Sequence, residues 1–199
     1  PVWWGYPLAM SVTYREHILP NGLRIAAEVD PKAVSAAAGF FVRSGARDEP
    51  TPLMGISHFL EHMVFKGTDA RGGEEIDEAF DELGVNHNAW TSHEITAFHV
   101  HGLPSTLEPA LRILADIMRP ALRSNDLADE AEVVVEEIAM YEDQPFWQLW
   151  ERVSETYYGQ HPMGHRVLGT ADTVRAVSPE AMRSWHAERY GADNVVLAL

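Results

Sequence analysis

The stretch "GISHFLEHMVFKGT", residues 55–68, joins an apolar helical pattern to three side chains that can take part in metal chemistry. Its apolar residues recur at the spacing of one α-helical face: Ile56, Phe59, Leu60, Met63 and Val64. His58, Glu61 and His62 lie on the other face. Because His58 and His62 are one turn apart, both imidazoles can point at one ion. The stretch predicts a helix that offers two zinc ligands and a glutamate that is free to hold a water molecule. Polar residues on the outer face of a helix are ordinary, so a third ligand is needed to distinguish a metal site from a solvated face.

The composition narrows the class of protein. The chain has 199 residues, of which 46% are hydrophobic, which is enough for one well-packed domain or two small ones. It contains no cysteine, so a zinc site must use histidine and carboxylate ligands. A formal net charge of −15 argues against nucleic acid as a partner, because phosphates would be repelled. No apolar run is long enough to predict a membrane span.

The two ends of the chain give separate expectations, a leader or an artificial remnant at the start and a truncated domain at the end. The start, "PVWWGYPLAM", lacks the basic region and long apolar core of a secretory signal. Met10 has the place of a natural start, so we interpret residues 1–9 as a leader or an artificial remnant and residues 10–199 as the domain. Because "NVVLAL" at 194–199 predicts a strand at the very end, we expect the domain to be truncated from a longer chain of two halves.

The periodicities predict an α+β fold. Strands are expected at 12–19, 23–29, 34–46, 85–92, 94–102 and 194–199, with a loop at 47–54. Besides the motif helix, helices are expected at 74–84, 104–120, 126–143, 146–159 and 178–191. Asn125 and Ser178 are the candidate caps of the helices that follow them. We therefore expect a mostly antiparallel sheet with helices packed mainly on one face.

The third metal ligand is expected in the acidic helix at 126–143, "DLADEAEVVVEEIAMYED". Glu130 and Glu137 are seven residues apart and share a face, so either could reach an ion held by the motif helix. Acidic residues on a helix are usually a solvated face. Spacing alone leaves four candidates open, namely Glu130, Glu132, Glu136 and Glu137.

Three segments carry a family resemblance, namely "HFLEHMVFKGT", "LGVNHNAWTSHE" and "VVVEEIAMYEDQP". Together they resemble the M16 family of zinc metallopeptidases, the inverzincins, which include pitrilysin, insulysin and the β-subunit of the mitochondrial processing peptidase. The family carries the inverted motif H-x-x-E-H and a distal zinc-binding glutamate on a later helix. Weaker matches such as "LPNGLRI", "HPMGHRVLGT" and "ERYGADNVVLAL" extend the resemblance over about residues 14–199. The expected fold is therefore the N-terminal catalytic half of an M16 peptidase.

The resemblance implies a role for each site residue. Zn²⁺ would be held by His58, His62 and Glu137, with Glu136 the rival ligand because the spacing is one residue short of the mitochondrial members. Glu61 would be the general base. Glu130 would not bind the metal but would support the residues that do. The segment "NAW" matches the family's "N-A-Y-T" strand edge, which pairs with the substrate backbone. Its residues Asn88, Ala89 and Trp90 are thus expected to bind substrate, with Trp90 in place of the usual tyrosine.

The expected function is a zinc-dependent endopeptidase that acts on peptides or unfolded polypeptides and pairs with a C-terminal half or a homologous subunit. Two alternatives stand beside it: a non-catalytic scaffold subunit, and a zinc-binding fragment that is inactive without its second half. In a bacterium the resemblance implies the cytoplasm or the periplasm. We interpret Trp147 and Trp150 as core residues, and the remaining histidines as packed or exposed rather than as ligands. His161 and His165 are four apart, but Pro162 and Gly164 argue against a helix that would pair them.

Overall fold

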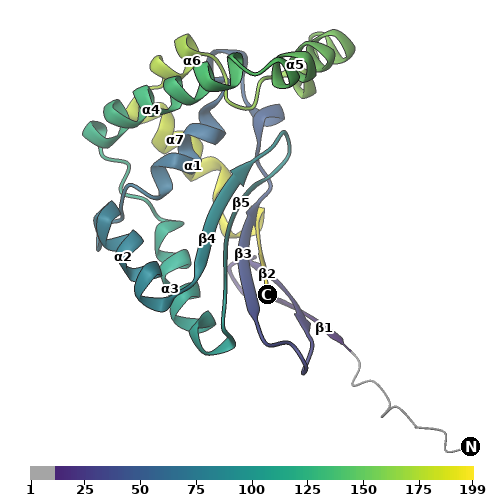
Figure 1. Ribbon diagram of the computed structural model, residues 1–199, viewed down its shortest axis with the longest axis vertical. Coiled ribbons are helices and arrows are strands. Elements are labelled where there is room, and N and C mark those ends of the chain that lie inside the picture. The colour runs from purple at the N-terminus through teal and green to yellow at the C-terminus, as the bar shows by residue number, and fades with distance from the viewer. Residues whose placement is uncertain (1–11) are drawn as a thin grey trace, which may run out of the picture.

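The computed structural model describes residues 12–199, and within them the chain forms one mixed sheet covered by helices (Figure 1). The expected leader at residues 1–9 lies outside the described residues. The strands are β1 (Thr13–Ile18), β2 (Arg24–Val29), β3 (Ala36–Val42), β4 (Asn86–Thr91), β5 (Thr96–Gly102) and β6 (Val195–Ala198). The helices are α1 (Ile56–Val64), α2 (Gly73–Leu83), α3 (Leu107–Ile117), α4 (Ser124–Glu142), α5 (Pro145–Tyr158), α6 (Ala171–Arg175) and α7 (Pro179–Arg189).

The strand order is β1-β2-β6-β3-β5-β4. Four of the five strand pairs are antiparallel, and β2 with β6 is the parallel one. The last strand is therefore inserted between β2 and β3, where Phe40 of β3 lies opposite both Leu197 and Phe98. This α+β arrangement, with a mostly antiparallel sheet, confirms the expected fold class.

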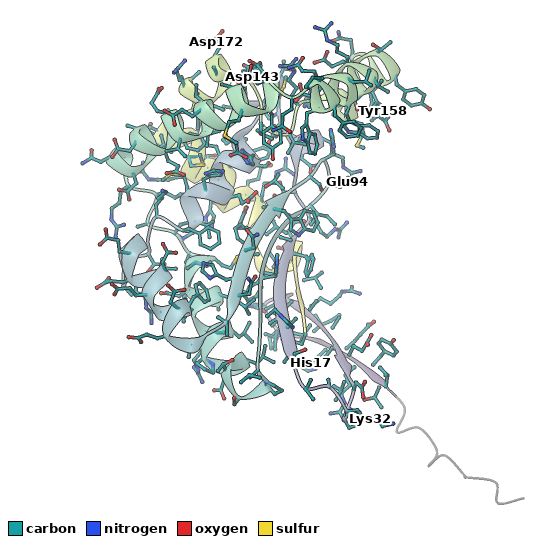
Figure 2. The ribbon with its side chains drawn as sticks, viewed as in Figure 1. His17, Lys32, Glu94, Asp143, Tyr158 and Asp172 are labelled. Atoms are coloured by element: carbon teal, nitrogen blue, oxygen red, sulfur yellow. The ribbon has the colours of Figure 1, made fainter. Side chains whose placement is uncertain are left out.

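The core lies between one face of the sheet and the helices. In Figure 1 helices α1, α2, α3, α4 and α7 all lie on the same side of the sheet, and Figure 2 shows side chains filling the layer between. Phe40 and Val42 of β3 and Phe98 and Val100 of β5 point into this layer, because alternate residues of a strand share a face. The helices are therefore packed mainly on one face, as the sequence predicts.

The motif helix is central to this core. All five of its predicted apolar residues, Ile56, Phe59, Leu60, Met63 and Val64, are at most 1% exposed. Burying a side chain of this size stabilises a protein by roughly 1.5–3 kcal/mol. Helix α1 thus has little freedom to shift, and its polar face has a fixed position relative to β4 and α4.

Three details differ from the sequence predictions. Helix α4 begins at Ser124, so the exposed Asn125 lies inside the first turn and is not the cap. The expected loop at 47–54 contains two short 3₁₀ helices, η1 (Ala46–Asp48) and η2 (Thr51–Leu53). Helix α6 was not predicted, because its five residues are too few for a periodic signal. Within residues 12–199 no helix is both long and apolar enough to cross a bilayer.

Candidate active site

Helices α1 and α4 bring three potential metal ligands together. The Nε2 atoms of His58 and His62 lie 3.6 and 3.2 Å from the same carboxylate oxygen of Glu137. Each residue offers one ligand atom, and these three atoms all lie within 4.8 Å of one another. Ligand atoms of a tetrahedral zinc site are roughly 3.4 Å apart, given metal–ligand distances near 2.1 Å. Two imidazoles and one carboxylate therefore fit Zn²⁺ in both chemistry and spacing.

The rival third ligands lie elsewhere on α4. Glu136 is exposed, and Glu132 is tied at the surface to Arg175 by hydrogen bonds of 2.9 and 2.8 Å. Glu130 is almost fully buried, but it faces the back of the His62 ring. Of the four candidates that spacing left open, Glu137 is the one whose carboxylate reaches both histidine Nε2 atoms.

His62 is oriented by a buried carboxylate. Its Nδ1 donates to Oε1 of Glu130 at 2.9 Å, and Lys66 contacts the other oxygen of Glu130 at 2.5 Å. The carboxylate can only accept, so Nδ1 of His62 carries a proton in this contact, and Nε2 is directed toward Glu137. Burial lowers the pKa of His62, but its hydrogen bonds to Glu130 and Glu137 outweigh burial and raise the pKa to about 9.

His58 has a different environment. Burial, followed by the charge on His62, lowers the pKa of His58 to about 4. Its Nδ1 is buried and has no hydrogen-bond partner among the described residues. The His58 ring meets the His62 ring edge to face, with 4.7 Å between centroids. Packing and the backbone of α1, rather than a carboxylate, therefore decide where the His58 ring points.

Glu61 lies beside the two histidines and is linked to the sheet. The hydroxyl of Thr91, at the end of β4, donates to Oε2 of Glu61 at 2.5 Å. Burial raises the pKa of Glu61, while the Thr91 hydrogen bond opposes this rise. A carboxylate with a raised pKa beside a metal can accept a proton from water near neutral pH.

Strand β4 forms one edge of the sheet within the described chain, next to the candidate ligands. Its residues alternate between exposed and half-buried: Ala89 packs against the core, whereas Asn88 and Trp90 point away from it. The N–H of Ala89 donates to the side chain of Asn88 at 2.8 Å. An edge strand of this kind can pair with an extended peptide through its free backbone groups.

A cleft of about 280 Å³ opens at the end of β4. Thr91 and His93 contribute to one wall, and the aromatic rings of Tyr141, Trp147 and Trp150 contribute to another. Trp147 and Trp150 are 43% and 58% exposed, so their interpretation as core residues is wrong. Their spacing on an amphipathic helix predicts an apolar face. Only the fold shows that α5 extends beyond the sheet (Figure 1), where Trp147 and Trp150 line the cleft.

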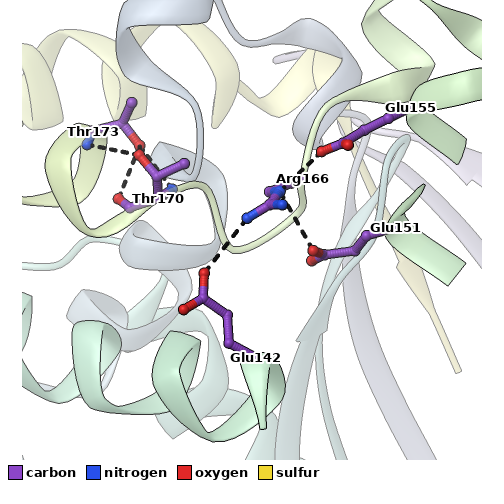
Figure 3. A network of polar contacts seen from close by, with 6 residues as sticks. All are labelled: Glu142, Glu151, Glu155, Arg166, Thr170 and Thr173. Carbon is purple, nitrogen blue, oxygen red and sulfur yellow. Dashed lines mark hydrogen bonds and ion pairs between the residues drawn. The ribbon is translucent and has the colours of Figure 1, made fainter. Parts of the chain in front are cut away.

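Arg166 lines the cleft and forms ion pairs with three glutamates around it (Figure 3). Its Nε lies 3.0 Å from Glu155 and 3.4 Å from Glu151 on α5, and its guanidinium lies 3.6 Å from Glu142 at the end of α4. One cation thus joins the loop before α6 to two helices. The aromatic face of α5 is held in place without being buried.

The remaining histidines agree with their interpretation as packed or exposed side chains. His87 stacks on Phe80 with 4.2 Å between centroids. His93 contacts the carbonyl oxygen of His165 at 3.0 Å, and His165 contacts that of Ala46 at 3.1 Å. Among residues 12–199, His58, His62 and Glu137 form the one group of histidine and acidic side chains placed closely enough to hold a metal ion.

Two residues in contact with the site were missed by the sequence analysis. Thr91 directly follows the segment of Asn88, Ala89 and Trp90, and it shares the core-facing side of β4 with Ala89. Lys66 is four residues after His62, and both side chains contact the carboxylate of Glu130. This spacing of one helical turn was the signal that could have paired Lys66 with His62. Neither contact can be predicted without knowing that β4 and α4 flank α1.

An inverted H-x-x-E-H helix, a distal glutamate and an exposed edge strand together define a zinc metallopeptidase type of domain. The family model for insulinase, peptidase family M16, matches residues 24–171. The chain therefore belongs to peptidase family M16, the family that the three sequence segments resemble.

Individual relatives agree with this assignment. The chain is 38% identical over 186 residues to the uncharacterized zinc protease YmxG of Bacillus subtilis, covering 93% of this chain and 46% of that protein. It is 36% identical to the uncharacterized zinc protease Rv2782c of Mycobacterium tuberculosis, covering 96% and 44%. The crystal structure of a protease from Helicobacter pylori superposes with a TM-score of 0.89 at 25% identity, covering 94% and 46%. The chain spans about half the length of the curated relatives it matches.

Proposed function

We propose that the protein is a zinc-dependent endopeptidase that hydrolyses peptides or unfolded polypeptides, with His58, His62 and Glu137 as the metal ligands and Glu61 as the general base. The observation that carries this proposal is the convergence of both histidine Nε2 atoms on one oxygen of Glu137, beside the half-buried carboxylate of Glu61. Bound Zn²⁺ would polarise the scissile carbonyl and lower the pKa of water at the site.

Each residue around the metal would have a separate task. Glu61 would accept a proton from the attacking water and pass it to the leaving amine. Thr91 would hold the Glu61 carboxylate through its hydroxyl, and Glu130 would keep the His62 ring in the orientation that presents Nε2. The zinc names of the relatives support the choice of metal.

The substrate would lie along the free edge of β4 as an added strand, contacting Asn88, Ala89 and Trp90. This would place a neighbouring substrate side chain at the cleft lined by Trp147 and Trp150, because the cleft begins at Thr91 where β4 ends. Aromatic walls favour a large apolar side chain there. The complete catalytic chamber would also require a C-terminal half or a homologous subunit, which would supply further contacts to the substrate.

The test separates the base from the ligands. Glu61→Gln should retain zinc and lose peptide hydrolysis, because an amide cannot accept the proton. Glu137→Gln should weaken zinc binding itself. The zinc content and hydrolysis of a fluorogenic peptide are measured for both variants in the longest form of the protein. Loss of zinc in Glu61→Gln with normal zinc in Glu137→Gln would reverse the two roles. A Glu61→Gln variant with normal hydrolysis would point to the scaffold alternative or to another base.

A further inference from the structure

Glu49 is a buried carboxylate at the start of the ligand-bearing helix. It is only 3% exposed, although it lies in the segment expected to be a loop. One oxygen accepts the backbone N–H of Gly55 at 2.7 Å, and the other accepts that of Ser57 at 2.8 Å. Both oxygens are therefore engaged with the first turn of α1, the turn that contains His58.

Glu49 accepts these backbone N–H groups from outside the helix because the residue at the N-cap position has no side chain that could do so. Gly55 occupies the N-cap with φ of 93°, a left-handed conformation that favours glycine. A Cβ at this position would lie 2.5 Å from the carbonyl oxygen of Leu168. A serine or aspartate cap is thereby excluded, and the first turn of α1 contains no acidic residue. Glu49 supplies the missing acceptor and, when it is ionised, the negative charge that a helix N-terminus favours.

The two histidines differ in what fixes them. The His62 ring is held by Glu130, whereas Nδ1 of His58 has no hydrogen-bond partner among the described residues. The direction of the His58 ring therefore depends on the backbone of its own turn. The N–H that immediately precedes His58 in the chain is that of Ser57, which is the one that Glu49 holds.

We infer that Glu49 is a positioning residue for the metal site: its carboxylate fixes the first turn of α1 and, through Ser57, sets the direction in which His58 presents Nε2. The residue does not contact the metal and acts through the backbone. This inference rests on the proposed role of His58 as a ligand. It assigns to Glu49 the orienting function that Glu130 has for His62.

The geometry suggests a variant of the same size. Glu49→Gln keeps the volume of the side chain but replaces one acceptor oxygen by an NH₂ group, which then faces a backbone N–H. The first turn of α1 must shift or leave a donor unsatisfied. Glu49→Asp keeps both oxygens but is one methylene shorter, so it should displace the turn less severely and provides a second test if the glutamine variant does not fold.

The control is the loss of an ordinary helix cap. The hydroxyl of Ser178 accepts the N–H of Ala181 at 3.1 Å at the start of α7, which carries none of the three candidate ligands. Ser178→Ala removes one N-terminal hydrogen bond and should lower the unfolding temperature modestly. It therefore reproduces a purely structural effect without touching the motif helix.

The experiment measures zinc affinity by competition with a chromogenic chelator, and the absorption spectrum of the Co²⁺-substituted protein, at temperatures where every variant is folded. Glu49→Gln should weaken zinc binding about tenfold, the size of effect seen when a group behind a ligand is removed, and should alter the Co²⁺ spectrum. Ser178→Ala should change neither. Unchanged zinc affinity and spectrum in Glu49→Gln, or an equal loss in Ser178→Ala, would overturn the inference. If instead His58→Ala binds zinc as tightly as the unaltered protein, it is the proposed metal site that fails.

Discussion

Thr91 and Glu61 are joined by a hydrogen bond of 2.5 Å between a strand end and a helix. The threonine hydroxyl donates to Oε2 of Glu61, a carboxylate whose pKa is also affected by His62 of α1 and Glu137 of α4. This contact connects the edge strand, where a substrate would pair, to the residue proposed to activate water. Its two partners are 30 residues apart in the sequence.

Thr91→Val should reduce kcat/KM for a peptide about tenfold while leaving zinc content unchanged. Valine has nearly the same shape, so the loss of the hydroxyl frees the Glu61 carboxylate without opening a cavity. The measurement is steady-state hydrolysis together with metal analysis. Thr106→Val, which removes a hydroxyl that donates to the carbonyl oxygen of Leu103 far from the site, is the control and should retain full activity. Normal hydrolysis by Thr91→Val would show that the contact does not position the base.

His58→Ala and His62→Ala should each lose most of the bound zinc, because the two remaining protein ligands bind the ion too weakly. The unaltered protein should contain close to one zinc per chain. Metal content after dialysis, measured by atomic absorption, tests both statements. His87→Ala is a suitable control, since this histidine stacks on Phe80 and is not part of the metal group. Full zinc in the His58→Ala, His62→Ala double variant would rule out the proposed site.

Glu130→Gln should weaken zinc binding by about tenfold to a hundredfold without removing a ligand. The amide can still occupy the space of the carboxylate, but it no longer offers a charged acceptor to both His62 and Lys66. A titration with a competing chelator gives the affinity. The matched control is Glu132→Gln, on the same helix but paired with Arg175 at the surface. An equal affinity for the two variants would contradict the assigned role of Glu130.

Burial raises the pKa of Glu49 to about 7, although its backbone hydrogen bonds oppose this and Asp48 adds to it. A carboxyl whose pKa is higher in the folded chain holds its proton more tightly there. Glu49 should therefore make stability fall as the pH rises from about 4.5 to about 7, by up to about 3 kcal/mol. Urea unfolding with a chelator present, at pH 5 and pH 7.5, compares the protein with Glu49→Gln. The free energy of unfolding of the unaltered protein should fall relative to that of Glu49→Gln between pH 5 and pH 7.5. A difference between the two proteins that stays constant with pH would refute this prediction.

Trp150→Ala should raise KM for peptides with a large apolar side chain and leave the unfolding temperature nearly unchanged. The ring is 58% exposed, so it contributes little to the core, yet it lines the cleft at the end of β4. Tyr157→Ala is the control on the same helix, because that ring is 81% exposed and does not line the cleft. A marked loss of stability in Trp150→Ala would indicate a structural role, and an unchanged KM would remove the cleft from the substrate path.

The sequence alone was sufficient for the six strands, for every α-helix except α6, and for half of the site. A 3.6-residue repeat of apolar side chains identifies a buried helix wherever it is long enough, so α1, α2 and α4 were anticipated, whereas α7 was anticipated from the cap residue Ser178. The same repeat places His58 and His62 on one face, since residues four apart on a helix are neighbours by geometry. The fold class followed from the mixture of alternating and helical patterns.

Contacts between elements depended on the tertiary structure. Whether Glu130, Glu132, Glu136 or Glu137 approaches the histidines depends on how α4 crosses α1, and this crossing is set by the packing of both helices in the core. The insertion of β6 between β2 and β3, and the exposure of Trp147 and Trp150, depend in the same way on how the whole chain is arranged. The role of Thr91 arises from a hydrogen bond to a helix 30 residues away in the sequence. The role of Glu49 arises from hydrogen bonds made by a segment that has no periodic pattern. Local periodicity describes which face of an element is buried, but only the assembled fold decides what that face, and the opposite one, will contact.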